Sequence, residues 1–391
     1  MTLNILIAPS GFKESLDASD VAAAIASGVH AAMPDARTLL APLVDGGEGF
    51  TRALVAATGG QLHERTVTGP VGQPVAACFG FLGRPGPKTA VIEMAAAAGL
   101  ALVPRDQRNP MLTTSYGVGE LILAALDAGA ERILIGCGDS GINDGGAGMA
   151  EALGIRLLDA KGQQIARGGG ALADLARIDL SGRDPRLDRV RLDAAVNWHN
   201  ILLGPKGVAR VFAPQKGATP EQVVILEAAL ETYAACLRDA TGQDLASAPG
   251  GGASGGLGAG LQGLLGARLH PRYNIVMQYL AFDDLLGQAD LVITAEGCLD
   301  EQTPFGKIPA EVARRAKALG IPVVALAGTI GRGKVRINFE HGIDAFASIL
   351  KRPCTLEEAI AESEKLLRRA AEDAVRMIGV GIRLRGERTA A

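Results

Sequence analysis

Short apolar runs alternate with amphipathic stretches at both ends of this 391-residue chain. The apolar runs predict strands at residues 3–8, 38–43, 291–294, 322–327 and 345–349, and the amphipathic stretches predict helices at about 18–33, 310–319 and 356–378. Alternating strands and helices favour parallel strands joined by right-handed crossovers. We therefore expect the two ends of the chain to form halves of one doubly wound parallel sheet.

The middle of the chain has a different pattern, with short β segments among glycine and proline residues. The pattern there predicts strands at residues 65–81, 90–94 and 132–135 and helices at about 117–128, 145–153 and 220–240. A glycine-rich segment at 248–261 keeps Leu257 and Leu261 at helical spacing, which predicts a glycine loop that leads into a packed helix.

A chain of this length exceeds what one hydrophobic core usually supports, so two domains are expected. We predict an α/β fold in which residues 1–65 and 286–391 form one discontinuous domain. Residues 66–285 are then a second α/β domain inserted into the first.

Composition and charge exclude several classes of protein. The net charge of -3 lacks the basic excess of a nucleic-acid-binding protein. The five cysteines are scattered and never spaced as C-x-x-C, which disfavours a disulfide framework and a zinc site. No signal peptide is apparent, and apolar runs end well before the ~18 residues of a membrane helix. These features predict a cytoplasmic protein with no nucleic-acid or membrane partner.

Polar side chains follow the ends of several predicted strands, in loops that contain glycine. These loops are Pro9–Lys13, Asp45–Gly49, Gly138–Gly146 and Glu296–Lys307. Such loops at the carboxyl ends of strands are typical of an α/β enzyme that handles an anionic ligand. A kinase needs one or two carboxylates for Mg²⁺ and a cation to offset charge on the transferred phosphoryl group. The loop acids are Asp45, Glu48, Asp144, Glu296 and Asp300, and the loop cations are Lys13, Lys206, Lys216 and Lys307.

Two other readings of the loops stay open at this point. The glycines at 250–258 could supply backbone N–H groups to a phosphate, although neither a P-loop nor a G-x-G-x-x-G turn is present. A serine hydrolase would need a nucleophile in a G-x-S-x-G elbow, and Ser140 lacks that setting. His199 lies beside the only tryptophan and is a candidate for substrate contact.

Several longer motifs occur in a fixed order along the chain. They are Ala8-Pro9 with Phe12-Lys13 and Ser15-Leu16, Asp45-Gly-Gly-Glu-Gly49, Gly69-Pro70, Val91-Ile-Glu-Met-Ala95, Asn143-Asp-Gly-Gly146, Gly204-Pro-Lys-Gly207, Pro214-Gln-Lys-Gly-Ala-Thr219, Thr294-Ala-Glu-Gly297, Asp300, Gln302-Thr303 and Gly306-Lys307. In these motifs the chain resembles the type 1 glycerate kinases over nearly its whole length, to about residue 350. The resemblance implies ATP-dependent phosphorylation of D-glycerate, usually at the 2-hydroxyl, and dependence on Mg²⁺. It also implies a flavodoxin-like domain interrupted by a second α/β domain.

Three loops depart from the pattern of that family. Ser10 replaces an acid in the first loop, and Asp139 introduces a new one. The usual Asp-Val-Asp-Asn is Asn197-Trp-His-Asn200, which exchanges two carboxylates for an amide and an imidazole. Because carboxylates bind Mg²⁺ and accept hydroxyl protons, these changes bear on the metal site and on the identity of the acceptor.

The site assignments combine the loop chemistry with the resemblance. The predicted catalytic residues are Asp45, Glu48, Asp144, Glu296, Asp300 and Lys307, with Asp45, Glu296 and Asp300 as metal ligands. The predicted substrate-binding residues are Lys13, Ser140, Asn143, Asn197, His199 and Lys216. The predicted ATP-binding residues are Gly250, Gly251, Gly252, Ser254, Gly255 and Gly256.

Two alternatives are kept beside the glycerate kinase. One is the same kinase scaffold with a different hydroxy acid, sugar acid or polyol as acceptor, and the other is a ligand-binding relative without catalysis. The oligomeric state is also open, a homo-oligomer included.

Overall fold

The computed structural model describes residues 2–12 and 15–389. The chain divides into two compact units. The first unit contains Met1–Val44 and Val276–Ala391, and the second unit contains Asp45–Ile275. The sequence pattern had placed these boundaries near residues 65 and 285.

The first boundary comes earlier because the segment after Asp45 packs on the sheet of the second unit. Strand β3 (Gln61–Thr68) pairs antiparallel with β4 (Pro74–Phe81). Helix α2 (Phe50–Thr58) packs against both of them. A hydrophobic pattern predicts that such elements exist, but not which sheet they join.

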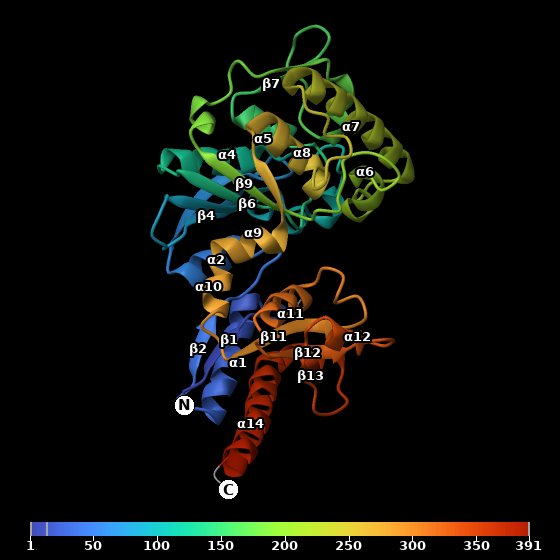
Figure 1. Cartoon of the computed structure of the whole chain (residues 1–391). Helices are drawn as coiled ribbons and strands as arrows, with labels where there is room; N and C mark the ends of the chain where they lie inside the picture. Colours follow the sequence, from blue (N-terminus) through green and yellow to red (C-terminus); the bar gives the residue numbers. More distant parts are fainter. Residues whose placement is uncertain (1, 13–14, 390–391) are drawn as a thin grey trace. The chain divides into compact units, whose positions relative to one another are not determined.

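The first unit is a doubly wound parallel sheet with helices on both faces (Figure 1). Its strands are β1 (Asn4–Ile7), β2 (Arg37–Leu40), β11 (Leu291–Leu299), β12 (Val323–Ile330) and β13 (Ala345–Ser348). Its helices are α1 (Ala18–Ala32), α10 (Phe282–Leu286), α11 (Ile308–Ala318), α12 (Ile337–Glu340), α13 (Leu356–Ala361) and α14 (Ser363–Thr389), and α9 (Arg272–Tyr279) spans the boundary.

The strand order is β13-β12-β11-β1-β2, and each neighbouring pair is parallel. Counted along the chain within this sheet, that order is 2-1-3-4-5, which is the flavodoxin-like arrangement. The predicted fold class is therefore confirmed.

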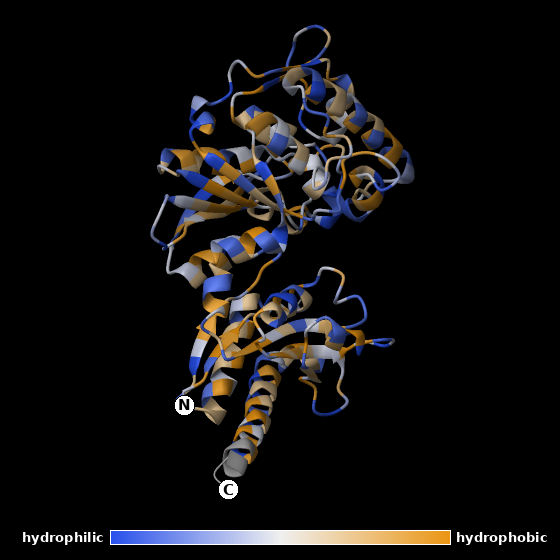
Figure 2. Cartoon of the chain, viewed as in Figure 1, coloured by the Kyte–Doolittle hydropathy of each residue, from blue (hydrophilic) through white to orange (hydrophobic). Residues whose placement is uncertain are grey.

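Hydrophobic residues run through the strands of this sheet (Figure 2). Because successive strand side chains point to opposite faces, Ile5, Ile7 and Ile293 share one face. They form a buried core with residues of α1 and α14, including Ile25 and Leu367. Helix α11 packs against β11 and β12.

Close approach of α1 and α14 depends on a glycine. A Cβ at Gly28 would lie 2.1 Å from the carbonyl oxygen of Arg368 and 2.9 Å from Cβ of Ala371. We expect Gly28→Ala to destabilise the protein by about 1–3 kcal/mol, because one methyl group must push the helices apart. Urea denaturation measures this change.

Gly381→Ala in α14 is the matched control. A Cβ at Gly381 meets no described atom within 4 Å. The substitution is expected to leave stability unchanged or raise it by about 0.5–1 kcal/mol, because alanine favours the helix. Equal destabilisation by the two substitutions would contradict the packing argument.

The second unit is built on a mixed sheet with the order β10-β9-β6-β5-β4-β3. Its remaining strands are β5 (Thr89–Glu93), β6 (Arg132–Gly136), β9 (Arg191–Val196) and β10 (Arg268–Pro271), and β7 (Arg156–Leu158) pairs with β8 (Arg177–Asp179). Its remaining helices are α3 (Ala95–Ala98), α4 (Tyr116–Asp127), α5 (Ala147–Ala152), α6 (Val208–Phe212), α7 (Pro220–Thr241) and α8 (Ala253–Leu265). Strands β5, β6, β9 and β10 are parallel, so their carboxyl ends share one edge of the sheet.

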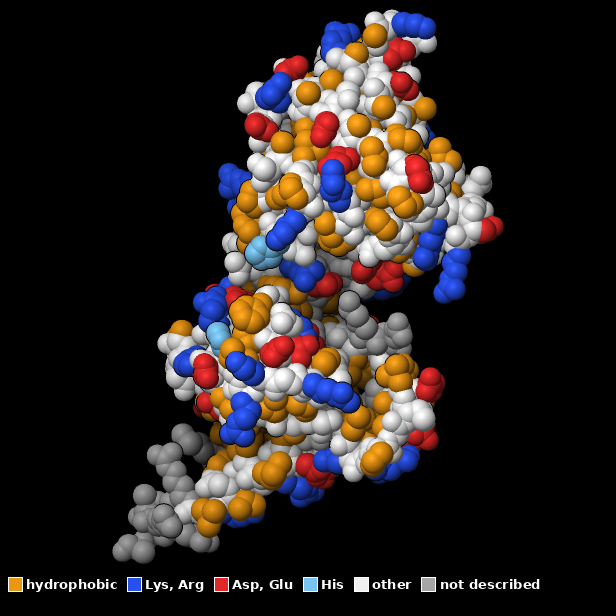
Figure 3. All heavy atoms as spheres, turned by 90° about the vertical axis from the view of Figure 1, so that its right-hand side faces the viewer, with side chains coloured by type: hydrophobic (Ala, Val, Ile, Leu, Met, Phe, Trp, Pro, Cys, Tyr) orange, Lys and Arg blue, Asp and Glu red, His pale blue; other side chains and the backbone are white. Residues whose placement is uncertain are grey.

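The surface has no broad field of one charge on the face drawn in Figure 3, where Lys and Arg side chains are interspersed with Asp and Glu. Within the described residues, no helix is long and apolar enough to cross a membrane. All five cysteines are free thiols.

Candidate active site

The topological switch point of the first unit lies between β1 and β11. From this central pair the chain continues to β2 on one side and to β12 on the other. In doubly wound sheets, ligands bind outside the carboxyl ends of the strands at such a point. Ser10 and Glu296 stand at these ends. The Ser10 N–H and hydroxyl both donate to the carbonyl of Ala295, at 2.8 and 3.1 Å.

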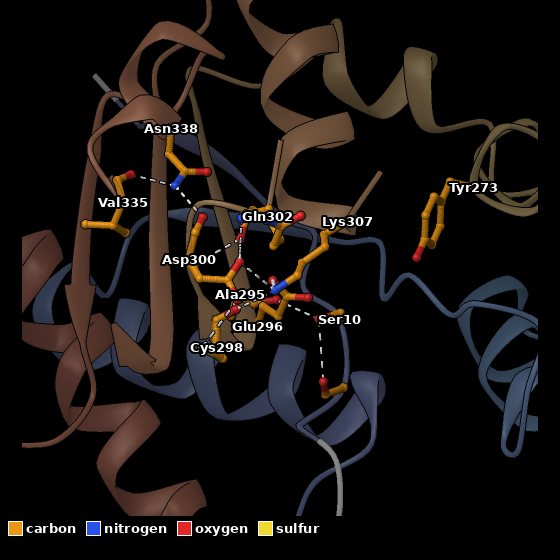
Figure 4. Close-up of polar contacts among 12 residues, drawn as sticks. Ser10, Tyr273, Ala295, Glu296, Cys298, Asp300, Gln302, Lys307, Val335 and Asn338 are labelled. Atoms are coloured by element: carbon orange, nitrogen blue, oxygen red, sulfur yellow. Dashed lines mark hydrogen bonds and ion pairs between the residues drawn. The ribbon is translucent and has the colours of Figure 1, made fainter. Parts of the chain in front are cut away.

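Three predicted catalytic residues meet at this edge and form what we call the Lys307 cluster: Glu296, Asp300 and Lys307 (Figure 4). The Lys307 Nζ donates to Asp300 Oδ1 at 3.1 Å and lies 3.7 Å from Glu296 Oε2. It also donates to the carbonyl of Cys298 at 3.1 Å. The strand β11 extends to Leu299, so Glu296 lies on the strand itself and not in the predicted loop.

Asp300 is held in place from several directions. Its Oδ1 accepts the N–H of Gln302 at 2.9 Å and the hydroxyl of Thr303 at 3.3 Å. Its backbone carbonyl accepts the Asn338 amide at 3.0 Å. Burial would raise the pKa of Asp300, but the Lys307 ammonium and the N–H of Gln302 hold it below its ordinary value. Asp300 is therefore a fixed, ionised carboxylate at neutral pH.

The loop that begins at Asp45 carries two predicted catalytic acids of the second unit, Asp45 and Glu48. Asp45 Oδ2 accepts a hydrogen bond from Arg272 Nη1 at 3.3 Å, and Asp45 Oδ1 accepts the N–H of Gly47 at 3.4 Å. Asp139 Oδ2 accepts the N–H of Glu48 at 3.0 Å. A Cβ at Gly47 would lie only 2.0 Å from Asp139 Oδ2, so the glycine permits the two acidic loops to approach. The Glu48 side chain itself is exposed.

Glu93, at the carboxyl end of β5, contacts the segment that follows this loop. Its Oε2 accepts the N–H of Thr51 at 2.9 Å, in the first turn of α2. Burial raises the pKa of Glu93, and the N–H groups of Thr51 and Gly49 oppose that rise. This carboxyl group anchors the start of α2 and thereby the end of the Asp45 loop.

A buried lysine lies at the carboxyl end of β6. Lys216 is 2 % exposed, and its Nζ donates to Ser140 Oγ at 2.9 Å and to the Ile142 carbonyl at 2.5 Å. Burial lowers the pKa of Lys216 to about 7, although the negative charge of Asp144 acts in the opposite direction. The amine is therefore poised between its charged and neutral forms near neutral pH.

Polar side-chain atoms without a partner among the described residues occur next to the segments that contact this lysine. Asn143 is fully buried, and neither Oδ1 nor Nδ2 has a hydrogen-bond partner among the described residues. Ser254 Oγ is also buried without a partner there. A Cβ at Gly255 would lie 2.1 Å from the same Ile142 carbonyl that Lys216 binds. We call Ser140, Asn143, Lys216 and Ser254 the Lys216 cluster.

Asp144 is buried among hydrogen-bond donors near the start of α5, and its catalytic role stays a prediction. Its Oδ2 accepts the N–H and the hydroxyl of Ser115 at 2.7 and 2.8 Å and the N–H of Gly148 at 3.2 Å. Its Oδ1 accepts the N–H of Gly146 at 3.1 Å. Burial raises the pKa of Asp144, and these donors oppose the rise. Its oxygens are thus engaged in holding the start of α5.

The other predicted substrate- and ATP-binding residues have contacts that do not point to a particular ligand. Asn197 Oδ1 accepts the N–H of His199 at 3.2 Å within a turn, and the His199 side chain is exposed. Gly250 and Gly252 are required by close packing, since a Cβ at Gly252 would lie 2.0 Å from the Ile201 carbonyl. Ser254, Gly255 and Gly256 are left-handed and break α8. Gly251 lies in the same turn, and its N–H donates to Ala248. Lys13 lies outside the described residues.

The donor set for a metal ion is sparse. In the part of the chain that the structure describes, no group of three or more His, Cys, Asp or Glu side chains is placed to hold one. A Mg²⁺ that carries phosphate needs only one or two carboxylates, because phosphate oxygens and water complete its shell. Asp300 Oδ2 fits this requirement, since its donor there is the Cys298 thiol, a weak donor 3.9 Å away.

Sequence reasoning missed the residues that support the site. The sequence marks Asp139 as an unusual acid but not as a neighbour of the Asp45 loop. Glu93 lies in one of the ordered motifs without an assigned role, and Arg272 and Asn338 lie in none of them. Glu93 and Arg272 each stand at or after the end of a strand in the parallel part of the second sheet, which is a signal that could have found them. Nothing in the local pattern around Asn338 indicates its contact with Asp300.

The switch point with its Lys307 cluster, in the first unit, is typical of an α/β enzyme. The buried Lys216 cluster, in the second unit, offers charged and polar groups to an anionic ligand. Comparison with known proteins specifies the class of the enzyme. A family model for the glycerate kinase family matches residues 5–379.

Individual relatives match over nearly their full length. The chain is 48 % identical over 371 residues to the glycerate kinase of Bacillus subtilis (strain 168), covering 95 % of this chain and 96 % of the relative. It is 44 % identical over 384 residues to the glycerate 2-kinase of Escherichia coli (strain K12), covering 98 % and 100 %. A crystal structure of a candidate glycerate kinase 2 from Salmonella typhimurium LT2 superposes with a TM-score of 0.88 at 45 % identity, covering 98 % of this chain and 100 % of that chain. The chain belongs to the glycerate kinase family and is a kinase.

Proposed function

We propose that the protein transfers the γ-phosphoryl group of ATP to D-glycerate and forms 2-phosphoglycerate. The observation that carries this proposal is the full-length identity of 44 % to a relative named glycerate 2-kinase. The Lys307 cluster and the Lys216 cluster support it, because each offers charged groups of the kind that phosphoryl transfer uses.

The roles of the residues follow from the chemistry of phosphoryl transfer, which depends mainly on positioning and on neutralisation of charge. Asp300 and Glu296 would hold Mg²⁺ in the first unit, and Asp45 is the candidate metal ligand of the second unit. Bound Mg²⁺ would neutralise phosphate oxygens. Lys307 orients Asp300 by its hydrogen bond at 3.1 Å. Lys216 and Ser140 would bind an anionic group of a substrate.

A different acceptor is the second candidate function. The turn at Asn197 and His199 carries an amide and an imidazole where the resemblance leads one to expect carboxylates. The exposed His199 could donate a hydrogen bond to a larger or more oxidised acceptor. This change alters only the acceptor and leaves the kinase scaffold in place.

An assay of ADP release with ATP and Mg²⁺ separates the two candidates. We expect kcat/KM for D-glycerate to exceed that for L-glycerate, D-lactate, glycerol and small sugar acids by at least about tenfold, because a site built for the carboxylate and both hydroxyl groups loses contacts with each analogue. Preference for another acceptor would transfer the proposal to that acceptor. ATP binding without ADP release for any acceptor would indicate a relative without catalysis.

The proposed setting is the cytoplasm, which the free cysteines support because thiols persist in a reducing compartment. The oligomeric state stays a prediction without support from the single chain.

A further inference from the structure

Lys216 is an unusual group because it is buried without an ion-pair partner. Among the described residues, no carboxylate forms a salt bridge with its Nζ, whose contacts are the Ser140 hydroxyl and the Ile142 carbonyl. The charged residue that acts on it, Asp144, has its own oxygens occupied by N–H and O–H donors of Ser115, Gly146 and Gly148.

The hydrogen-bond count favours a third partner for this amine. An ammonium group has three donors, and the two contacts leave one donor without an acceptor. A buried ammonium with an unused donor and no counter-ion is costly, so the group loses its proton easily in the free protein. An anion placed at the third position would supply both the acceptor and the counter-ion.

The side chains of Asn143 and Ser254 could also form hydrogen bonds with a polar ligand. Among the described residues, two side-chain atoms of Asn143 have no hydrogen-bond partner, and Ser254 Oγ is a third such atom. The left-handed backbone at Ser254, with a φ of 53°, is held beside Ile142 and Asn143 through Gly255. Buried polar atoms without partners are rare in folded proteins, and three such atoms on two neighbouring segments favour a ligand there.

We propose that Lys216 receives an anionic group of a ligand and that binding of this anion carries one proton into the protein. The anionic group is the carboxylate of the hydroxy-acid acceptor or a phosphate of the nucleotide, and this identification rests on the proposed function. Ser140 and Asn143 would complete the site as hydrogen-bonding partners of the same group.

The sign of the linkage follows from the charge of the bound state. An anion at Lys216 stabilises the ammonium, so the pKa of Lys216 rises when the ligand binds. The free protein has a pKa of about 7 at this group, as burial lowers it and Asp144 opposes. Affinity is therefore greatest below that pKa and falls by up to about tenfold per pH unit above it. Besides Asp144, the elements around Lys216 carry Arg108, whose backbone packs on Gly217.

Calorimetric titration of the full chain tests the proposal. D-glycerate alone and the non-hydrolysable nucleotide AMP-PNP alone are titrated at about pH 8 in buffers with different ionisation enthalpies, which reports proton uptake directly. We expect uptake that approaches one proton for one of the two ligands. Glycerol, which lacks the carboxylate, is a neutral control and should show none.

Two variants assign the proton to the lysine. Lys216→Met keeps the length of the side chain without its charge, and should abolish the uptake and weaken binding of that ligand by at least about tenfold at pH 6.5. Lys161→Met, at an exposed lysine of the same unit, should preserve both. If the Lys216 variant fails to fold, wild-type titrations in which both ligands bind without proton uptake would still overturn the inference.

The outcomes separate this inference from the proposed function. Uptake with D-glycerate, lost in Lys216→Met, supports a carboxylate site, and uptake with AMP-PNP, lost in the variant, supports a phosphate site. Binding of both ligands without uptake that depends on Lys216 would overturn the inference. A wild-type protein that shows the uptake with AMP-PNP yet phosphorylates no hydroxy acid would overturn the proposed function and support the Lys216 site.

Discussion

Changing Asp45 to asparagine is expected to lower kcat of the kinase reaction by about two to three orders of magnitude, the usual loss when a group that stabilises the transition state is removed. The amide keeps the size of the side chain but loses the charge that would bind Mg²⁺ or accept a hydroxyl proton. Asp45 is 49 % exposed and its ion pair with Arg272 is long, at 3.3 Å. Stability should therefore change by less than about 1 kcal/mol.

The measurement is kcat for ADP release together with the thermal midpoint of each protein. Asp239→Asn is the control, because Asp239 also lies in the second unit and pairs with an arginine, Arg238, at the surface at 3.6 Å. The control should keep both values. Near-normal turnover of the Asp45 variant would remove Asp45 from the site.

Changing Lys307 to methionine is expected to lower kcat by at least about a hundredfold. The substitution removes the ammonium that contacts Asp300, Cys298 and Glu296. The substitution should also change the pH dependence of kcat. Lys307 and the N–H of Gln302 hold the pKa of Asp300 below its ordinary value against the effect of burial, so loss of the ammonium raises that pKa.

The acid limb of the kcat profile should therefore move to higher pH in the Lys307 variant. Asp300 acts as a carboxylate, and activity is lost as the pH falls through its pKa. Lys317→Met is the control, since the Lys317 ammonium binds only the Glu340 carbonyl among the described residues, at 3.0 Å. A profile of the Lys307 variant that is lower at every pH but not displaced would show that Asp300 does not set the acid limb.

The alternation of strands and helices predicts the five strands of the first unit. The helix predicted at about residues 18–33 is α1, and the Asp17 carboxylate accepts the N–H groups of Ser19 and Asp20 at its start. Leu257 and Leu261, expected in a packed helix after the glycine loop, are fully buried. Such signals are local, so a single sequence carries them.

Other parts of the fold depend on contacts that are distant in the sequence. Strand β10 is a four-residue edge strand that ends in Pro271, too short to produce a periodic signal. The single helix predicted at about residues 356–378 is divided into α13 and α14. At this division the Ser15 hydroxyl donates to Ser363 Oγ at 2.7 Å. The boundary at Asp45 depends on which sheet accepts α2 and β3.

The candidate site also combines contacts that are local in the sequence with contacts between distant residues. Glu296, Asp300 and Lys307 are close in sequence, so one strand and one loop bring them together. Ser140 and Lys216 are 76 residues apart, and their contact is visible only in the folded chain. Asp144 belongs to a recognised motif, yet its position is decided by Ser115, whose role the sequence does not reveal.

The central claim is that this kinase phosphorylates the 2-hydroxyl of D-glycerate with ATP. Phosphorus NMR of the product formed from D-glycerate, ATP and Mg²⁺ tests it most directly, because 2- and 3-phosphoglycerate give distinct phosphorus signals. We predict one equivalent of 2-phosphoglycerate for each ADP released. Formation of 3-phosphoglycerate, or an absence of any phosphorylated glycerate while ATP is bound, would contradict the claim.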